Sequence, residues 1–420
     1  MNILLQQVTI ADPDSPHNGN KKDILITDGI INRIGDDISD NATQKLNARD
    51  LIVSPGWVDI FAHACDPGYE YRETLETCAK AAAAGGFTQL FVLPDTDPVI
   101  DNKTQVEYIK QKSGNLKINI QPLGTVSKKR EGKELSEMYD MRQSGATAFS
   151  DGLQPVQHAG LLLKALQYVR SFNGVIIQVP QDKSINASGL MNEGIISTRM
   201  GLQGIPAIAE ELIIARDIEL LSYTASALHI TGITTKKSVE LVKAAKDKGL
   251  NITCSVTPYH LFFCDEDLQG YNTNLKVNPP LRSRSDVMAL RQAVTEGHID
   301  CIASHHLPQD WDNKTCEFEY AKPGMIGLQT AYAAVQTILP ELSSTKIANL
   351  FSLNARKIFQ LNEATIEEGR TAELTLFNTN TFIFDKEKNK SRSQNSAFIN
   401  IPLNGNVVGI ISKGNLILNN

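Results

Sequence analysis

The sequence predicts an α/β protein whose main domain is a (β/α)8 TIM barrel and whose smaller domain is a β-sandwich built from both chain ends. Three observations lead to this fold. Both ends of the chain alternate apolar and polar residues, the middle repeats apolar runs followed by amphipathic stretches, and about eight such repeats fit in the middle. We therefore place the small β domain at residues 1–50 and 366–420, and the barrel at residues 51–365.

The two chain ends have the pattern of antiparallel strands. The segments NILLQQVTIAD and KKDILITDGIINRIGDD alternate around Asp-Gly and Gly-Asp turns. After NARKIFQL the same pattern returns in AELTLFNT, VVGIISKG and NLILNN, and the charged run DKEKNKSRS is typical of an exposed loop. Neither end has enough strands to bury a core alone, so we expect the two ends to pack together.

The middle of the chain has the pattern of parallel strands with crossover helices. Runs such as FTQLFVLP, GVIIQVP and NITCSV are apolar throughout, and helical segments such as TKKSVELVKAAKDKG separate them. Chemistry in such a barrel sits at the carboxyl ends of the strands, so the residues that follow each run are the candidates for a site. They are His63, Cys65, Asp95, Asp151, Gln178, Val179, His229, Gly232, His305 and His306.

Composition excludes several classes of partner. The 420 residues carry a formal net charge of −6, which gives no electrostatic reason to bind nucleic acid, and the basic run Lys128–Arg130 is typical of a solvated turn. The chain has no signal-peptide pattern and no apolar stretch near the ~20 residues that span a bilayer, so we expect a cytoplasmic protein that does not bind membranes. Six cysteines without a CxxC pair indicate reduced, mostly buried thiols.

Several segments resemble the dihydroorotases of the amidohydrolase superfamily. The stretch PGWVDIFAHACDPG is similar to a family segment that reads approximately PGFIDLHVHLREPG, and VLPDTDP is similar to MPNTNP. The likeness continues in family order through GATAFSDG, LHITGITT, KVNPPLRSRSD and IASHHLP and covers nearly the whole chain. The resemblance implies a barrel of the amidohydrolase type and a place in pyrimidine biosynthesis.

The resemblance also implies a metal-dependent reaction, but most of the ligand positions hold other residues. Family members hydrolyse or close a cyclic amide with one or two zinc ions, held by an HxH pair, a bridging carboxylate, two further histidines and an aspartate on the eighth strand. The corresponding positions here are Phe61 and His63, Asp151, Val179 or Gln178, Gly232, and His305 in place of the catalytic aspartate. Only His63 and Asp151 match the family's pattern.

The positions that hold the substrate carboxylate have changed as well. In the family, an arginine and the asparagine of MPNTNP bind that carboxylate, the guanidinium through two parallel charge-assisted hydrogen bonds. The resemblance puts Cys65 and Asp95 at these positions and Gln309 at the last histidine of TDHAPH, while Asn278 is retained. We therefore expect a vestigial pocket that disfavours a carboxylate, in which Asp95 is a turn residue.

Three functions remain open. The first is a non-catalytic dihydroorotase-like protein without a cofactor, in a homo-oligomer or hetero-oligomer; the resemblance implies aspartate carbamoyltransferase as its partner. The second is a hydrolase of another cyclic amide that uses one zinc ion at His63, Asp151 and His305, with Cys65 as a further ligand. The third is an active dihydroorotase with unusual ligands.

The combined loss of metal ligands, catalytic aspartate and carboxylate clamp favours the first function, a pseudoenzyme with a degenerate zinc site. In that interpretation His63 and His305 are satisfied polar residues of a filled pocket, and His229 is buried and hydrogen-bonded without a chemical role.

Overall fold

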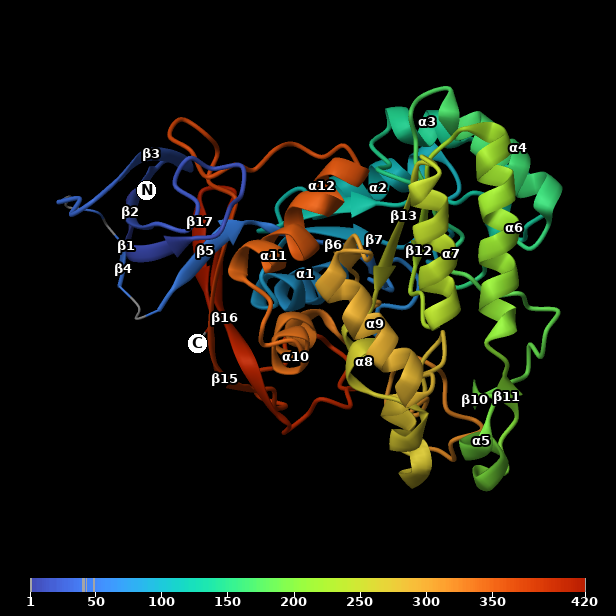
Figure 1. The fold of residues 1–420 in the computed structure, drawn as a ribbon. Helices are drawn as coiled ribbons and strands as arrows, with labels where there is room; N and C mark the ends of the chain where they lie inside the picture. Colours follow the sequence, from blue (N-terminus) through green and yellow to red (C-terminus); the bar gives the residue numbers. More distant parts are fainter. Residues whose placement is uncertain (1, 40–41, 43, 48–49, 420) are drawn as a thin grey trace.

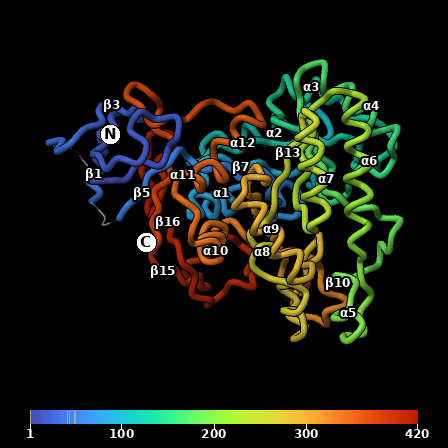
Figure 2. The backbone as a smooth tube through the Cα atoms, in the orientation of Figure 1, coloured from blue at the N-terminus to red at the C-terminus, as the bar shows by residue number. Residues whose placement is uncertain are grey.

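A computed structural model describes residues 2–39, 42, 44–47 and 50–419 of the chain. A β-rich part that contains both chain ends lies to one side of a larger part, in which helices surround central strands (Figure 1). In Figure 2 the blue N-terminal segment and the red C-terminal segment run next to each other in the β-rich part. The two ends of the chain therefore meet in one domain.

Strands from both ends of the chain share one sheet. Its order is β17-β16-β15-β5-β1-β2-β3, with β4 paired to β1. Apolar side chains from β1, β2, β5 and β15 form its core. The bounds are β1 Asn2–Ile10, β2 Lys21–Thr27, β3 Ile30–Gly35, β4 Gln44–Leu46, β5 Ile52–Pro55, β15 Leu374–Ile383, β16 Pro402–Ser412 and β17 Asn415–Leu418.

Two of the hairpins in this sheet have the turn that their sequences favour. Asp28 and Gly29 connect β2 to β3 with φ values of 50° and 81°, and Lys413 and Gly414 connect β16 to β17 with φ values of 50° and 73°. Two-residue turns with both residues at positive φ match the twist of antiparallel strands, and a glycine at the second position adopts such a φ without strain.

The barrel consists of parallel strands that form a closed ring. The strands are β6 Trp57–Ala62, β7 Phe87–Val92, β8 Asn119–Pro122, β9 Ile176–Gln178, β12 Leu228–Thr231, β13 Ile252–Val256 and β14 Cys301–Ile302. Single bridges at Phe149 join β8 to β9, and a bridge between Ala62 and His306 joins β14 to β6. With the Phe149 segment as the remaining member, the described residues form the predicted eight-membered barrel, which confirms the expected fold class.

The helices lie outside this ring (Figure 1). The apolar side chains on the outer faces of the strands pack against them. Several helices begin at a residue whose side chain accepts a backbone N–H, such as Thr74, Thr235 and Ser283. The helix bounds are α1 Leu75–Ala84, α2 Lys103–Ser113, α3 Met138–Gln143, α4 Ala159–Arg170, α5 Ile195–Met200, α6 Ile208–Thr224, α7 Lys236–Asp247, α8 Pro258–Phe262, α9 Arg284–Glu296, α10 Ala331–Ile338, α11 Ser344–Ala348 and α12 Asn354–Ile358, with the short strands β10 Met191–Asn192 and β11 Gly204–Ile205 between α4 and α6.

The apolar run that the sequence assigned to the first barrel strand divides at Gly56. β5 belongs to the terminal sheet and β6 to the barrel, so the chain passes from one domain to the other within a few residues. A Cβ atom at Gly56 would lie 2.3 Å from Oγ1 of Thr88, so only glycine fits this crossing. Directly after it, Trp57 packs against the rings of Tyr332, Phe351 and Phe377, which joins the sheet to the barrel.

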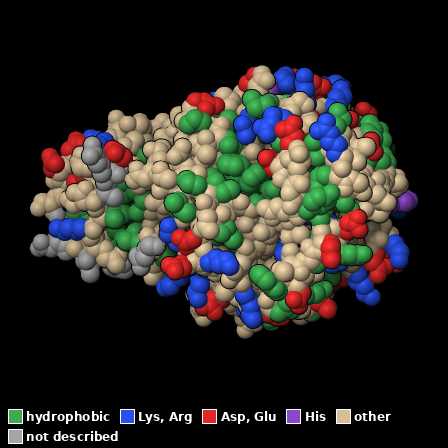
Figure 3. Space-filling view, turned by 90° about the horizontal axis from the view of Figure 1, so that it is seen from below, with side chains coloured by type: hydrophobic (Ala, Val, Ile, Leu, Met, Phe, Trp, Pro, Cys, Tyr) green, Lys and Arg blue, Asp and Glu red, His purple; other side chains and the backbone are tan. Residues whose placement is uncertain are grey.

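The surface has mixed charge where Figure 3 shows it. Among the side chains coloured in that view, Lys and Arg are interspersed with Asp and Glu, with no broad basic face. None of the helices that the structure describes is long and apolar enough to cross a membrane.

Candidate functional site

Several of the predicted site residues lie where neighbouring barrel strands end. His63 follows β6, and His305 and His306 follow β14; the two segments are adjacent, because the backbone N–H of His63 donates to the carbonyl of His306 at 2.8 Å. Asp95 follows β7 and Gly232 follows β12. The barrel thus places the expected residues at its carboxyl end, and their partners decide what the site can do.

His63 forms a close pair with Asp95. Its Nδ1 lies 2.5 Å from Oδ2 of Asp95, and the Asp95 side chain is 20% exposed. Burial raises the pKa of Asp95, but the charge and hydrogen bond of His63, together with the charges of Arg130 and Arg72, lower it to about 2. Asp95 therefore has a specific partner in His63, and the expectation that this pocket disfavours a carboxylate stays a prediction.

The His305 ring occupies the space beside Gly232. It stacks on Phe61, with ring centroids 4.3 Å apart and planes inclined by 28°, and its Nε2 lies 2.8 Å from Oγ1 of Thr231. A Cβ atom at Gly232 would lie 2.7 Å from Cε1 of His305. The histidine that replaces the family's aspartate thus takes the place that a side chain at Gly232 would need.

His305 is neutral and incompletely bonded. Burial, with the neighbouring rings of His260, His63 and His229, holds its pKa well below the usual value. Its Nδ1 is buried and has no hydrogen-bond partner in the part of the chain that the structure describes. We expected a satisfied polar residue here, and the structure corrects this for one of the two ring nitrogens.

The space under these rings is filled by apolar side chains. Phe61 and Val179 are fully buried, and both belong to a cluster inside the barrel that includes Phe91, Ile177 and Ala303. Phe61, and Val179 as one of the two residues that the resemblance aligns with a further histidine, are thus part of a packed core.

Both carboxylate oxygens of Asp151 accept hydrogen bonds from the neighbouring loop. The N–H groups of Val126 and Ser127 donate to Oδ1 at 2.8 and 3.0 Å, and the Ser127 hydroxyl donates to Oδ2 at 2.5 Å. Burial raises the pKa of Asp151, and these hydrogen bonds oppose the rise. The carboxylate positions a loop, which is a structural use of the group.

Cys65 is a protonated, buried thiol. It has φ 58°, and burial raises its pKa to about 12 although the charge of Arg72 acts in the opposite direction. A thiol that keeps its proton near pH 7 is a poor nucleophile. Arg72, a cation close to this position, is used elsewhere: its Nε and Nη2 donate to the carbonyl of Pro308 at 2.9 and 2.6 Å.

The other two pocket candidates have different surroundings. Gln309 lies in the wall of a cavity of about 450 Å³ that Tyr71 and Trp311 also line, and its Nε2 donates to the carbonyl of Pro323 at 2.7 Å. Asn278 is partly buried and precedes a cis peptide bond. Among the described residues no hydrogen bond joins Gln309 or Asn278 to the His63–Asp95 pair.

Sequence reasoning missed two charged residues near the site. Arg130, which we assigned to a solvated turn, donates from Nε to the carbonyl of Asp151 at 3.1 Å. Glu73 is fully buried, lies 3.4 Å from Nε2 of His306 and accepts the backbone N–H of Arg392 at 3.0 Å. A short basic run and a glutamate before a helix carry no pattern that would have identified either residue.

The donors that remain do not fit a zinc centre of the family's type. Tetrahedral zinc needs three or four converging protein ligands, or three and a water. The hydrogen bonds of His63 and His305 use Nδ1 and Nε2, respectively, and leave one ring nitrogen on each as a donor, whereas the oxygens of Asp151 accept three hydrogen bonds. Within the described ranges, no group of three or more His, Cys, Asp or Glu side chains could hold a metal ion.

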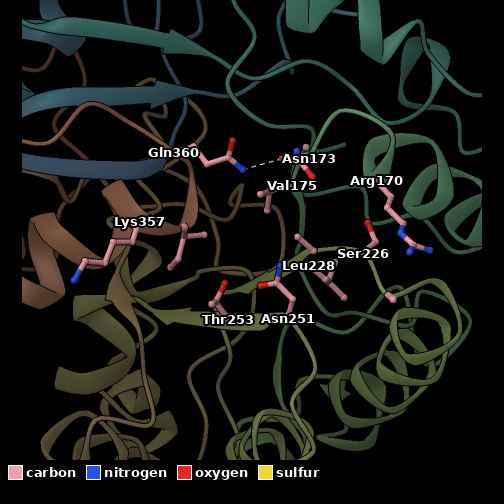
Figure 4. Close-up of a pocket in the computed structure, with 13 residues that line it drawn as sticks. Arg170, Asn173, Val175, Ser226, Leu228, Asn251, Thr253, Lys357 and Gln360 are labelled. Carbon is pink, nitrogen blue, oxygen red and sulfur yellow. Dashed lines mark hydrogen bonds between the residues drawn. The ribbon is translucent and has the colours of Figure 1, made fainter.

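A chain of hydrogen bonds leads from His305 through the barrel to its opposite end. Oγ1 of Thr231 lies 2.8 Å from Oγ of Ser255, which lies 3.0 Å from Nε2 of His229, and Nδ1 of His229 lies 2.8 Å from Oγ1 of Thr253. Burial lowers the pKa of His229 to about 3, so this ring is neutral near pH 7. Thr253 lines a cavity of about 320 Å³ at the amino ends of the strands (Figure 4).

Comparison with known sequences finds the same group of proteins throughout. The family described as Dihydro-orotase-like matches residues 50–238. A dihydroorotase from Acetivibrio thermocellus is 40% identical over 421 residues, which is 99% of each chain. A dihydroorotase from Syntrophus aciditrophicus is 36% identical over 423 residues, again 99% of each chain.

Comparison with solved structures finds the same fold at lower sequence identity. The L-hydantoinase (dihydropyrimidinase) from Arthrobacter aurescens superimposes with a TM-score of 0.87 at 22% identity and covers 99% of this chain and 96% of its own. A D-hydantoinase gives a TM-score of 0.84 at 19% identity, with coverage of 100% and 95%. At these identities the likeness establishes the fold.

Proposed function

Because the chain belongs to the dihydroorotase-like family, we propose that it is a protein of pyrimidine biosynthesis that no longer turns over dihydroorotate and serves as a structural partner of aspartate carbamoyltransferase. The observation that carries the proposal is the stack of Phe61 on His305. Phe61 and His305 stand at positions that the resemblance aligns with a metal ligand and the catalytic aspartate, and the ring of His305 leaves no room for a side chain at position 232.

The groups left at the carboxyl end of the barrel are poorly suited to hydrolyse an amide. Such a reaction needs an activated water, which a metal ion supplies in related enzymes by lowering the pKa of bound water to about 7. Here burial holds the pKa of His305 well below its usual value, so its ring is a weak base near pH 7. Burial also raises the pKa of the Cys65 thiol to about 12, so this thiol keeps its proton. Neither side chain supplies the missing proton transfer.

One observation favours the alternative function, a hydrolase of another cyclic amide with a remodelled site. His63 and Asp95 form an ordered imidazole–carboxylate pair at the catalytic end of the barrel, with Asp95 partly exposed. Such a pair can orient a general base. Against it, the oxygens of Asp151, which this alternative needs as a zinc ligand, accept hydrogen bonds from Val126 and Ser127.

A role in assembly is supported by what the chain has kept. The barrel is complete, and two large aromatic side chains on the segment between β14 and α10, Trp311 and Tyr320, are 71% and 72% exposed. Exposed aromatic residues are enriched in protein interfaces. These features favour a function in which the chain binds another protein through its surface.

Two experiments test the proposal. In the first, the purified protein is assayed for ring opening and ring closure of dihydroorotate with added zinc; we expect no turnover above the blank, and turnover proportional to protein contradicts the proposal. The second mixes the chain with the aspartate carbamoyltransferase of the same organism and measures the mass of the complex. We expect a stable complex, and a mixture that elutes as two separate proteins rejects the assembly role.

A further inference from the structure

A cavity of about 450 Å³ lies among the loops that follow the barrel strands, and we call it the loop cavity. Its walls come from four connections: Tyr71 lies between β6 and α1, Thr273 between α8 and α9, Trp311 between β14 and α10, and Arg392 between β15 and β16. None of its described lining residues belongs to the apolar cluster around Phe61 inside the barrel. Segments far apart in the sequence thus form one recess outside the filled pocket.

Hydrogen bonds within the protein hold the walls of the loop cavity in place. The Asn395 side chain donates to the carbonyls of Leu307 and Gly324 at 3.0 and 3.1 Å, which fixes the β15–β16 connection on the β14–α10 connection. Nζ of Lys314 donates to the carbonyl of Thr273 at 2.8 Å, which joins the β14–α10 connection to the α8–α9 connection. Walls that are ordered before binding lower the entropy cost of association.

Two aromatic side chains of the loop cavity are mostly exposed. Trp311 is 71% exposed and Tyr71 is 57% exposed, although both line the cavity. A small molecule inside the cavity would leave most of this aromatic area in water, whereas a protein segment that crosses the mouth of the cavity would cover it. Exposed aromatic side chains beside a recess are typical of surfaces that bind other proteins.

The wall of the loop cavity has an excess of positive charge. Lys386 and Arg392 line it with exposed side chains, and within the described residues neither charged group has a hydrogen-bond or ion-pair partner. Asp310 is the acidic residue of the wall, and its two oxygens accept hydrogen bonds from Asn313 at 2.8 and 2.9 Å. Asp312, the next acidic residue, lies outside the wall. An acidic segment is thus the charge complement of this surface.

We propose that the loop cavity is the docking site for an acidic segment of a partner protein that carries one aromatic anchor; this inference rests on the assembly role proposed above. The anchor packs against Trp311 and Tyr71, and the carboxylates that flank it pair with Lys386 and Arg392 at the rim. Docking covers the aromatic area that the free chain exposes, and the charge pairs select the partner.

Fluorescence anisotropy of a labelled probe, the peptide Asp-Glu-Trp-Asp-Glu with blocked ends, tests the site on the full chain. We expect saturable binding that Trp311→Ala and Arg392→Gln each weaken about tenfold or more. Tyr223→Ala is the control for an exposed aromatic side chain, because Tyr223 on α6 is 75% exposed and does not line the cavity. Arg33→Gln is the control for an exposed arginine, since Arg33 lies on β3 of the terminal sheet. Absence of saturable binding, or equal affinities in all the variants, overturns the proposal.

Altered probes test the chemistry of the segment. A peptide with alanine in place of its tryptophan, and one with lysine in place of its four acidic residues, are each expected to bind at least about tenfold more weakly. N-acetyltryptophan is the probe for a small-molecule site. If it binds as tightly as the peptide, the cavity holds a small molecule and the docking proposal is wrong.

The same variants separate this inference from the assembly role. The complex with aspartate carbamoyltransferase is expected to dissociate more readily in Trp311→Ala and Arg392→Gln than in Tyr223→Ala and Arg33→Gln. A wild-type complex that the first two variants leave unchanged overturns the docking site and supports the assembly role. If no complex forms but the peptide binds as expected, the assembly role with this enzyme is rejected and the docking site is supported.

Discussion

The two ends of the barrel differ from those of a typical barrel enzyme, because the carboxyl end is filled and the amino end contains a cavity. At the carboxyl end, where such barrels hold their chemistry, stacked rings and apolar side chains occupy the site. At the amino end, which usually contributes only to stability, a cavity of about 320 Å³ remains open. The same strands connect the two ends, so the difference comes from a few side chains.

In the proposed function, this difference reflects a catalytic site that was lost while its fold was kept. The replacements at the carboxyl end support one another, because the missing side chain at Gly232 makes room for His305 and the ring of Phe61 covers it. A single reversal would therefore collide with its neighbours. The predictions below test this comparison in order of decreasing effect on stability.

Phe61→Ala is expected to have the largest effect. It removes a fully buried ring from the filled end of the barrel, and such changes cost about 3–5 kcal/mol of unfolding free energy. Val175→Ala is the counterpart at the amino end, where the removed methyl groups border existing space, and it should cost clearly less. Urea unfolding measures both, and equal losses would mean that the two ends are packed alike.

Gly232→His tests the mutual support of the replacements. The new Cβ would meet His305, and overpacking of this kind costs about 1–3 kcal/mol beyond the strain of placing a side chain at φ 71°. Gly249→His provides that strain alone, because Gly249 has φ 79° and no atom within 4 Å of its Cβ position. The double variant Gly232→His with His305→Asp should regain most of the unfolding free energy that Gly232→His loses beyond the loss in Gly249→His. If it recovers none, the clash with His305 is not the cause.

Asp95→Asn should cost about 2 kcal/mol near pH 7, because the pKa of Asp95 is lowered from 3.8 to about 2 and each unit corresponds to about 1.4 kcal/mol. A lowered carboxylate pKa stabilises the protein above pH 3.8, and this contribution is lost as the pH falls toward 2. The difference between variant and wild type in urea unfolding should therefore narrow over that interval. Asp97→Asn, which changes an exposed aspartate two residues further along the chain, is the control for the loss of a carboxylate in this segment.

Ser226→Ala is expected to have the smallest effect and to stabilise the protein by up to about 1 kcal/mol, because it removes a buried hydroxyl that has no partner among the described residues. Ser255→Ala is the contrasting change, since the Ser255 hydroxyl is bonded to both Thr231 and His229 and its loss breaks the chain. Thermal melting distinguishes them, and a destabilised Ser226→Ala would show that this hydroxyl has a partner.

The fold could be predicted from the sequence because periodic apolar runs report burial directly. Uniformly apolar runs indicated the barrel strands, and alternation of apolar and polar residues around Asp-Gly turns indicated the terminal sheet. The division of the first run at Gly56 could not be predicted, since no periodicity separates β5 from β6 and the close approach of Thr88 to Gly56 is a contact between different segments.

The site was predictable only as a set of positions. The order of the segments along the chain located Phe61, His63, Asp95 and His305, but not their partners. The His63–Asp95 pair and the packing of His305 beside Gly232 depend on distances between different strands, which a single sequence does not contain. Arg130 illustrates this limit, since its role depends on where the loop meets Asp151.

The most direct test of this account is the zinc affinity of the carboxyl end of the barrel, measured by competition with a chromogenic chelator. We expect the wild-type chain to bind less than one zinc ion per chain, and His63→Ala to leave the weak binding unchanged. A variant with Phe61→His, Val179→His, Gly232→His and His305→Asp should gain affinity relative to it. One tightly bound zinc ion per wild-type chain that is lost in His63→Ala would contradict the claim that these rings have replaced the metal site.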